Sequence, residues 1–291
     1  MDSLQSWFIL LRPRQWVKNL LVLAPIWFAF NYEADIIARG ITMFVAFCFG
    51  ASAIYIINDL RDIETDRHHP KKKNRPLASG AVSIPVAQVS AAVLAAVGLY
   101  ISFTLSLQSL LVLLGYMLLT ILYTISLKRV LILDVMVLAA GFVIRILAGG
   151  AATDIRVSHW ILICTFFIAL FMAFGKRKHE IDLLGGASVN HRAVLAGYSP
   201  EYLNQLLGIT SGISVLSYAL YTIDPQTQRV YGGDLILLTI LPVTFVVFRY
   251  LHILYSRERG GDPSRVLTED FPLVVSVLIW LLIIISIRFF T

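Results

Sequence analysis

The amino-acid sequence predicts an all-α, polytopic membrane protein, and two observations support this fold class. First, 58% of the 291 residues are hydrophobic and 14% are charged, whereas a soluble domain is about half apolar and about a quarter charged. Second, the apolar residues lie in long runs separated by short polar loops, which is typical of membrane-spanning helices. The runs do not alternate between apolar and polar residues, which argues against a closed barrel.

Nine apolar runs have about the length needed to cross a membrane, with eight or ten runs as alternatives. They cover residues 18–31, 36–57, 82–105, 107–126, 132–152, 157–176, 201–222, 234–255 and 271–289. The first run is short and contains Pro25, so we expect it to be broken or tilted. No soluble domain interrupts this pattern, and we expect a single integral membrane domain over residues 1–291.

Lysine and arginine residues are concentrated in alternate loops. Of the 24 Lys and Arg residues, 18 lie in one set of loops and four in the other, and the richer set is expected to face the cytoplasm. We therefore predict a multi-pass protein of the cell (inner or plasma) membrane. Its N-terminus and its two active-site loops, at about 58–81 and 176–200, are expected to be cytoplasmic. These loops explain the net charge of +6 without a nucleic-acid partner.

A group of acidic residues stands at the end of the second run. Asp59, Asp62 and Asp66 lie at positions i, i+3 and i+7, so a continuing helix would place them on one face. Three carboxylates on one face repel each other unless a cation lies between them, and their oxygen atoms suit Mg²⁺, with Mn²⁺ as an alternative. With Asn58, they are our candidate metal-binding and catalytic residues for a diphosphate substrate. A solvated acidic helix end is the alternative, and it is disfavoured because acids at the mouth of a membrane-spanning helix are costly and usually functional.

A basic stretch follows these acids. Arg67 and Arg75 are candidate phosphate ligands, because a guanidinium group can donate two hydrogen bonds to a phosphate. The run Lys71–Lys73 is partly explained by cytoplasmic orientation and by contact with anionic lipid, and Lys73 is kept as a candidate substrate ligand. The pair His68-His69 has no second cluster at metal-ligand spacing, which argues against a transition-metal site.

A second group of charges stands at the end of the sixth run. Lys176, Arg177 and Lys178 precede Glu180 and Asp182. The two acids are two positions apart and cannot share a helix face. This pattern favours binding of an anion over binding of a metal, and Lys176, Arg177 and Glu180 are candidate substrate-binding residues. A cluster that only sets the orientation in the membrane is the alternative.

Four further candidates lie around the fifth run. Tyr123 lies near the end of the fourth run and Lys128 just after it. Asp134 lies at the start of the fifth run, and Arg145 lies well inside it. Asp134 and Arg145 are close to three helical turns apart, so they share a face at a separation of about 16 Å. A buried arginine faces a cavity or a partner and not lipid. We expect these residues to contact substrate, with an ion pair of Arg145 that fixes helix packing as the alternative.

These motifs resemble those of the UbiA superfamily of intramembrane transferases. Its first acidic motif is similar to Asn58-Asp59-x-x-Asp62-x-x-x-Asp66, and its following loop is similar to Arg75-Pro76-Leu77-Ala78-Ser79-Gly80. Further segments resemble the decaprenyl-phosphate phosphoribosyltransferase branch. These are Leu11–Asn19, which contains Lys18, the turn Asp66–Pro70, Asp134 with Gly141-Phe142-x-x-Arg145, and Gly175-Lys176-Arg177-x-x-Glu180.

The resemblance implies a UbiA-like bundle of about nine helices and a Mg²⁺-dependent transferase. The branch transfers 5-phosphoribose from phosphoribosyl diphosphate to a polyprenyl phosphate, releases diphosphate and so supplies precursors of cell-wall arabinan. Lys18 then joins the candidate substrate ligands. The expected partners are these two substrates and the membrane, and a homo-oligomer is left open.

Two other functions are considered. Members of the superfamily that act on aromatic acceptors carry a second acidic motif at the end of the sixth span. In this sequence that position holds only Glu180 and Asp182 after three cations, which disfavours an aromatic prenyltransferase of quinone or haem biosynthesis. A transporter is disfavoured because the charges gather at one rim and not at the midplane.

Overall fold

The structure is a computed structural model that describes residues 3–68, 72–184, 193–256 and 269–290. All regular elements in these ranges are helices, which confirms the predicted all-α class. By their contacts the helices form two compact units, Met1–Ile125 with Ile144–Val157 and Ser126–Val143 with Ser158–Thr291. The predicted loops at about 58–81 and 176–200 lie partly outside the described residues, and His69, Pro70 and Lys71 lie outside them.

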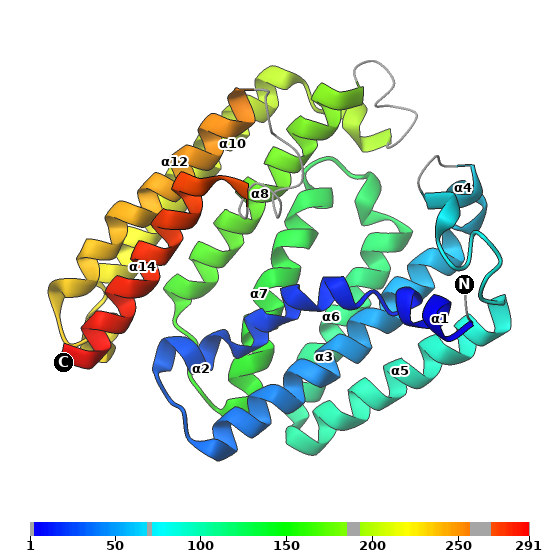
Figure 1. Cartoon of the computed structure of the whole chain (residues 1–291), viewed down its shortest axis with the longest axis horizontal. Helices are drawn as coiled ribbons and strands as arrows, with labels where there is room; N and C mark the ends of the chain where they lie inside the picture. Colours follow the sequence, from blue (N-terminus) through cyan, green and yellow to red (C-terminus); the bar gives the residue numbers. More distant parts are fainter. Residues whose placement is uncertain (1–2, 69–71, 185–192, 257–268, 291) are drawn as a thin grey trace. The chain divides into compact units, whose positions relative to one another are not determined.

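The first unit is built around one long helix, α3 (Ala34–Arg61). It packs against α5 (Ile84–Leu105), α6 (Leu107–Ile125) and the 3-10 helix η1 (Pro13–Leu23) (Figure 1). The unit also contains α1 (Ser3–Leu10), α2 (Ala24–Ala29), α4 (Ile63–Arg67), η2 (Lys72–Asn74) and the second half of α7 (Leu133–Thr153). Gly98 lets α3 and α5 approach closely, because a Cβ atom there would lie 2.9 Å from the carbonyl oxygen of Ala46.

The first predicted span, residues 18–31, is divided between two elements, as the presence of Pro25 led us to expect. The 3-10 helix η1 ends at Leu23, and the short helix α2 begins at Ala24 with Pro25 in its first turn. Proline is tolerated there because the first turn of a helix needs no backbone donor. Residues 18–31 therefore do not form one continuous α-helix.

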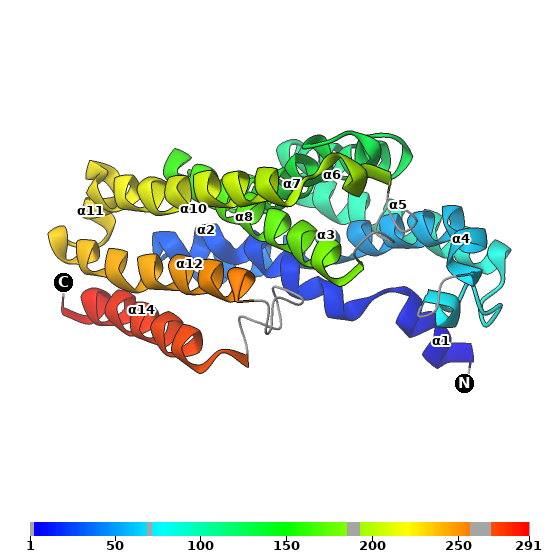
Figure 2. The same cartoon turned by 90° about the horizontal axis from the view of Figure 1, so that it is seen from above.

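The second unit contains the remaining helices. They are η3 (Leu127–Arg129), the first half of α7, α8 (His159–Leu184), η5 (Ala193–Gly197), α10 (Pro200–Ile223), α11 (Pro225–Val230), η6 (Asp234–Thr239), α12 (Ile240–Tyr255) and α14 (Phe271–Phe290). Figures 1 and 2 show α10, α12 and α14 side by side. The side chain of Ser199 caps α10 by accepting a hydrogen bond from the backbone of Tyr202.

Seven helices of the described chain are long and apolar enough to cross a membrane. They are Ala34–Arg61, Ile84–Leu105, Leu107–Ile125, Leu133–Thr153, His159–Asp182, Pro200–Ile223 and Asp234–Tyr255. The segment Phe271–Ile287 of α14 is a shorter apolar helix, so the predicted count of nine is approximate.

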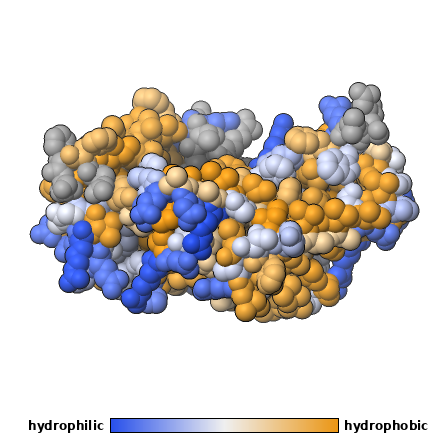
Figure 3. Space-filling model, turned by 90° about the horizontal axis from the view of Figure 1, so that it is seen from below, coloured by the Kyte–Doolittle hydropathy of each residue, from blue (hydrophilic) through white to orange (hydrophobic). Residues whose placement is uncertain are grey.

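Large apolar side chains are exposed along these helices. On α5 the exposed side chains recur every three or four residues, at Val86, Val89, Val93, Val97 and Tyr100. Hydrophobic residues also cover wide areas of the face drawn in Figure 3. Such surfaces are stable in contact with lipid, and the chain is a multi-pass membrane protein.

Candidate active site

The predicted acidic motif lies where α3 passes into α4. Asp62 joins the two helices, with φ −94° and ψ 8°. Backbone hydrogen bonds from Asp62 to Asn58 (3.0 Å) and from Asp66 to Asp62 (2.8 Å) continue the helical path across the joint. Asp59 and Asp66 are both buried, whereas Asp62 and Asn58 are half-buried. The structure therefore brings the first and last aspartates of the motif into one buried position.

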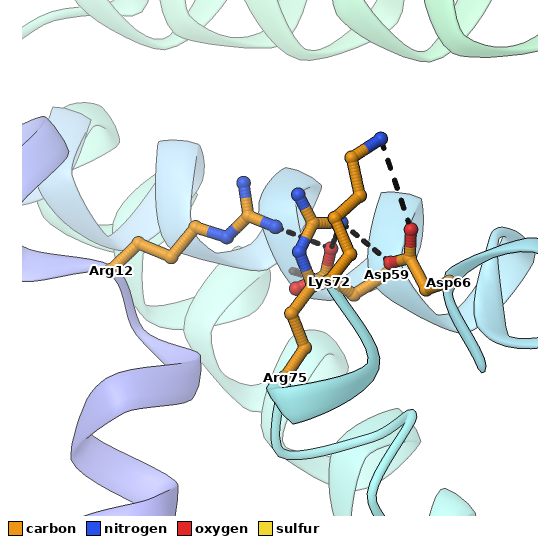
Figure 4. A network of polar contacts seen from close by, with 5 residues as sticks. All are labelled: Arg12, Asp59, Asp66, Lys72 and Arg75. Carbon is orange, nitrogen blue, oxygen red and sulfur yellow. Dashed lines mark hydrogen bonds and ion pairs between the residues drawn. The ribbon is translucent and has the colours of Figure 1, made fainter. Parts of the chain in front are cut away.

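Three cationic side chains surround these two carboxylates (Figure 4). Arg12 Nη2 donates to Asp59 Oδ1. Arg75 Nη1 lies 3.1 Å from Asp59 Oδ1 and 2.6 Å from Asp66 Oδ2, so one nitrogen serves both acids. Lys72 Nζ lies 3.9 Å from Asp66 Oδ1. We call the five residues Arg12, Asp59, Asp66, Lys72 and Arg75 the rim cluster.

Arg12 is positioned by the backbone on either side of it. It caps η1 in the left-handed conformation, with φ 54° and ψ 55°, which is uncommon for a residue with a side chain. Ser52 on α3 holds this segment, because its hydroxyl donates to the carbonyl of Leu11 (2.8 Å) and accepts from Trp16 Nε1 (3.0 Å). The guanidinium group also lies over the ring of Tyr55, 5.3 Å from its centre.

Arg75 is positioned by a turn whose apolar residues are anchored in the first unit. Pro76 and Leu77 are buried directly after it, and Leu77 belongs to a core cluster with Leu10 and Ile56. The turn is closed by a backbone hydrogen bond from Val82 to Pro76 (3.0 Å). The Arg75 side chain itself is 28% exposed. Its backbone is therefore fixed while its guanidinium group retains room to rotate.

The oxygen atoms of the rim cluster fit a hard divalent cation. In the described part of the chain no group of three or more His, Cys, Asp or Glu side chains is close enough to hold a metal. Asp59 and Asp66, however, already converge on one positive centre, Nη1 of Arg75. One or two carboxylates are the usual protein ligands of Mg²⁺, which completes its coordination with phosphate and water.

Other predicted ligands of the first unit lie outside the rim cluster. Arg67 is exposed and pairs with Glu64 one turn away, at 2.7 Å. Lys18 and Lys73 are exposed, and Tyr123 on α6 is half-buried. Their contact with substrate stays a prediction.

Arg145 is buried in the first unit. Its Nε donates to Asn19 Oδ1 (2.8 Å) and its Nη2 to the hydroxyl of Tyr116 (2.9 Å). The group also lies over the rings of Phe47 and Tyr116. Asn19 in turn donates to Cys48 on α3 (3.3 Å). Arg145 thus joins η1 to α3 and α6, which favours its packing role, and substrate contact stays a prediction.

A second ionic network lies in the second unit. Arg177 Nε donates to Asp134 Oδ2 (2.8 Å) and its Nη1 to Glu180 Oε2 (2.7 Å), and both Arg177 and Asp134 are fully buried. The hydroxyl of Tyr198 donates to Asp134 Oδ1 (2.7 Å) and accepts from the backbone of Ile132 (3.0 Å). Burial and the hydrogen bond to Asp134 raise the pKa of Tyr198, so its phenol stays protonated and remains a donor.

The neighbouring charges of α8 differ in exposure. Lys176 is exposed, and Lys178 Nζ lies 3.5 Å from Asp182. Glu180 thus pairs with Arg177 and Asp182 with Lys178, which agrees with a spacing that keeps the two acids off one helix face. Lys128 is half-buried on η3. Among the predicted ligands of this unit, Arg177 is engaged within the network, and contact of Lys176 with substrate stays a prediction.

Sequence reasoning did not assign Arg12, Lys72 or Tyr198 to a site. Arg12 lies 47 residues from Asp59 in the chain. Tyr198 lies 64 residues from Asp134. The sequence marks Arg12 only by its place in the Leu11–Asn19 segment and Lys72 only by its place in the basic run Lys71–Lys73, and no local pattern marks Tyr198.

Comparisons with known proteins identify the family of the chain. Residues 20–282 match the model of the UbiA prenyltransferase family. The chain is 35% identical over 286 residues to the decaprenyl-phosphate phosphoribosyltransferase of Mycolicibacterium smegmatis, covering 93% of this chain and 88% of the relative. It is 37% identical over 283 residues to the enzyme of that name from Corynebacterium glutamicum, covering 94% and 84%.

Solved structures share the fold. A UbiA homologue from Archaeoglobus fulgidus bound to GPP and Mg²⁺ superposes with a TM-score of 0.70 at 21% identity, over 97% of this chain and 98% of that chain. A structure described as digeranylgeranylglyceryl phosphate synthase superposes with a TM-score of 0.73 at 19% identity, over 99% of each chain. Because the family model matches most of its length, the chain belongs to the UbiA prenyltransferase family.

Proposed function

We propose that this protein transfers 5-phosphoribose from phosphoribosyl diphosphate to a polyprenyl phosphate of the decaprenyl type and releases diphosphate. The relatives of 35% and 37% identity carry the name of this activity over most of both chains. The structural observation that supports it best is the rim cluster, in which two buried carboxylates meet three cations. Such a mixture suits a diphosphate that is bound together with a divalent metal ion.

Asp59 and Asp66 are the proposed metal ligands, with Asn58 and Asp62 as their neighbours on the same helical path. Mg²⁺ is the proposed ion, since a UbiA homologue of the same fold is described as bound to it, and Mn²⁺ is a substitute of similar ligand preference. When bound, the ion would neutralise negative charge on the departing diphosphate.

The arginines of the rim cluster are the proposed ligands of the diphosphate oxygens. Arg12 and Arg75 come from different segments of the chain, both donate to Asp59 Oδ1, and each guanidinium group has further donors. Lys18, Arg67, Lys73, Lys128 and Lys176 are proposed as further anion ligands. Holding the leaving group at fixed donors lowers the barrier to its departure because the donors need no reorganisation during the reaction.

The acceptor does not require a strong general base. The bond between C1 of ribose and the diphosphate oxygen breaks, and charge develops at C1. A phosphate oxygen of the polyprenyl phosphate forms the new bond to C1, and that oxygen is already anionic at neutral pH. The substrates thus supply the nucleophile and the leaving group, and the protein binds and orients them.

The proposed location is the cell membrane, with the rim cluster at the cytoplasmic surface. The uneven distribution of Lys and Arg between alternate loops supports this orientation. A cysteine introduced by Ser79→Cys should react with an impermeant maleimide only after cells are opened, whereas Asp154→Cys should react in intact cells. The reverse labelling would contradict the orientation. The product is proposed to serve cell-wall arabinan.

An aromatic prenyltransferase is the alternative, and the second unit argues against it. Glu180 pairs with Arg177 and Asp182 with Lys178, so these acids do not converge on one point as two metal ligands would. The test uses purified protein in detergent with Mg²⁺, a polyprenyl phosphate and labelled phosphoribosyl diphosphate. Label should enter the organic phase, and EDTA should abolish this transfer.

The same preparation separates the alternatives. Turnover of an allylic diphosphate with an aromatic acid, and none with phosphoribosyl diphosphate, would overturn the proposed reaction and retain the family. Turnover in detergent, where no second compartment exists, would exclude transport as the primary activity.

A further inference from the structure

The charges of the rim cluster do not favour a bare metal ion. Its two carboxylates carry two negative charges, and Arg12, Lys72 and Arg75 carry three positive ones (Figure 4). Counting the half-buried Asp62 as well, the cluster is neutral and not negative. A divalent cation alone would therefore replace existing ion pairs without a net attraction, whereas an anionic diphosphate would be attracted by the same cations.

The position of Arg75 makes this competition direct. Its Nη1 lies between Asp59 Oδ1 and Asp66 Oδ2, at 3.1 and 2.6 Å. A Mg²⁺ ion bound to the same oxygens would lie at about 2.1 Å from them. The guanidinium group and a metal ion at these oxygens would repel each other strongly, so Arg75 would have to move away for Asp59 and Asp66 to hold the ion.

The surroundings of Arg75 allow its side chain to change partners. Pro76 and Leu77 fix the backbone by their burial, so the loop need not move. The side chain is 28% exposed, whereas those of Asp59 and Asp66 are 3% exposed. Rotation of this one partly exposed arginine removes the cation that the two acids share, provided that another anion accepts the guanidinium group. Arg12 then stays paired with Asp59, and Lys72 with Asp66.

We propose that Arg75 is a place-holding cation that neutralises Asp59 and Asp66 until a diphosphate accepts its guanidinium group. This proposal rests on the proposed function, since it concerns the same metal and diphosphate. Metal and diphosphate then bind cooperatively, because each removes the obstacle to the other. The structure assigns Arg75 two successive roles, first as the partner of the acids and then as a ligand of the diphosphate.

The test measures two affinities in the purified full-length protein in detergent. Binding of Mn²⁺ alone is followed by electron paramagnetic resonance, and binding of labelled inorganic pyrophosphate is measured without metal. Arg75→Ala should bind Mn²⁺ about tenfold more tightly than the wild type and pyrophosphate about tenfold more weakly, within the usual range of coupling between two ligands. Arg75→Lys keeps a positive charge and should stay near the wild type for Mn²⁺.

Opposite changes in the two affinities distinguish this role from loss of folding, which would weaken both. Arg14→Ala is the matched control, because it removes an exposed arginine from the segment that carries Arg12, and it should leave both affinities within about twofold. Unchanged or weaker Mn²⁺ binding by Arg75→Ala would overturn the place-holding role, even if phosphoribosyl transfer is observed. Failure of the wild type to bind Mn²⁺ and to transfer phosphoribose would overturn the proposed function as well.

Discussion

The carboxylates of Asp59 and Asp66 belong to two different helices, α3 and α4, and both accept a hydrogen bond from one nitrogen atom of Arg75. The joint at Asp62 preserves the helical path, so seven residues of separation return the chain to the same face. Burial of both acids makes them depend on a cation at this point. Removal of either acid therefore disturbs the ion pairs that both acids form with Arg75.

Asp59→Asn and Asp66→Asn should each lower phosphoribosyl transfer by about a hundredfold or more, because each removes the negative charge of a proposed metal ligand. The rate of transfer of label into the organic phase measures this. Asp35→Asn is the matched control, since it removes an exposed carboxylate from the other end of α3. Full activity of Asp59→Asn would contradict the assignment of this residue.

Arg177→Ala should destabilise the protein by about 3–5 kcal/mol, because it leaves the buried Asp134 without its ionic partner. Lys178→Ala on the same helix breaks a longer contact to a partly exposed acid and should cost about 1 kcal/mol or less. Melting temperatures in detergent compare the two variants. If Arg177→Ala melted like the wild type but bound phosphoribosyl diphosphate poorly, the sequence-based prediction of a substrate ligand would be supported instead.

Arg145→Leu should destabilise the protein by about 1–3 kcal/mol for each buried group left unsatisfied, namely Asn19 Oδ1 and the hydroxyl of Tyr116. The comparison is Arg39→Ala, which breaks an exposed ion pair with Asp154 and should cost about 1 kcal/mol or less. Thermal unfolding of both variants is the measurement. Equal melting temperatures would show that the contacts of Arg145 do not hold η1 in place.

Gly149→Ala should disrupt the contact between α7 and η1, because the added Cβ atom would lie 1.9 Å from the carbonyl oxygen of Val22. Gly115→Ala on α6 meets no atom within 4 Å and should be neutral or stabilise its helix by up to about 1 kcal/mol. The yield of folded protein and its melting temperature compare the two. A well-folded Gly149→Ala protein would contradict the close packing described for this pair.

The helices were predictable from the sequence because each apolar run is long and bounded by polar residues, and Pro25 marked the break in the first span. The convergence of Asp59 and Asp66 followed from their helical spacing. The joint at Asp62 could not be foreseen, since no proline or glycine marks it. The burial of Arg177 was equally hidden, because a buried ionic network and an exposed basic cluster have the same local sequence.

The winding of η1 determines which residues of α3 it can reach. A 3-10 helix rises about 2.0 Å per residue, compared with about 1.5 Å in an α-helix. From Arg12 to Asn19 the chain therefore advances about 14 Å, close to the distance of about 16 Å between their partners Asp59 and Cys48 along α3. An α-helix would advance only about 10 Å and lose one of the two contacts. The 3-10 winding thus keeps Arg12 and Asn19 in register with their two partners on α3, Asp59 and Cys48.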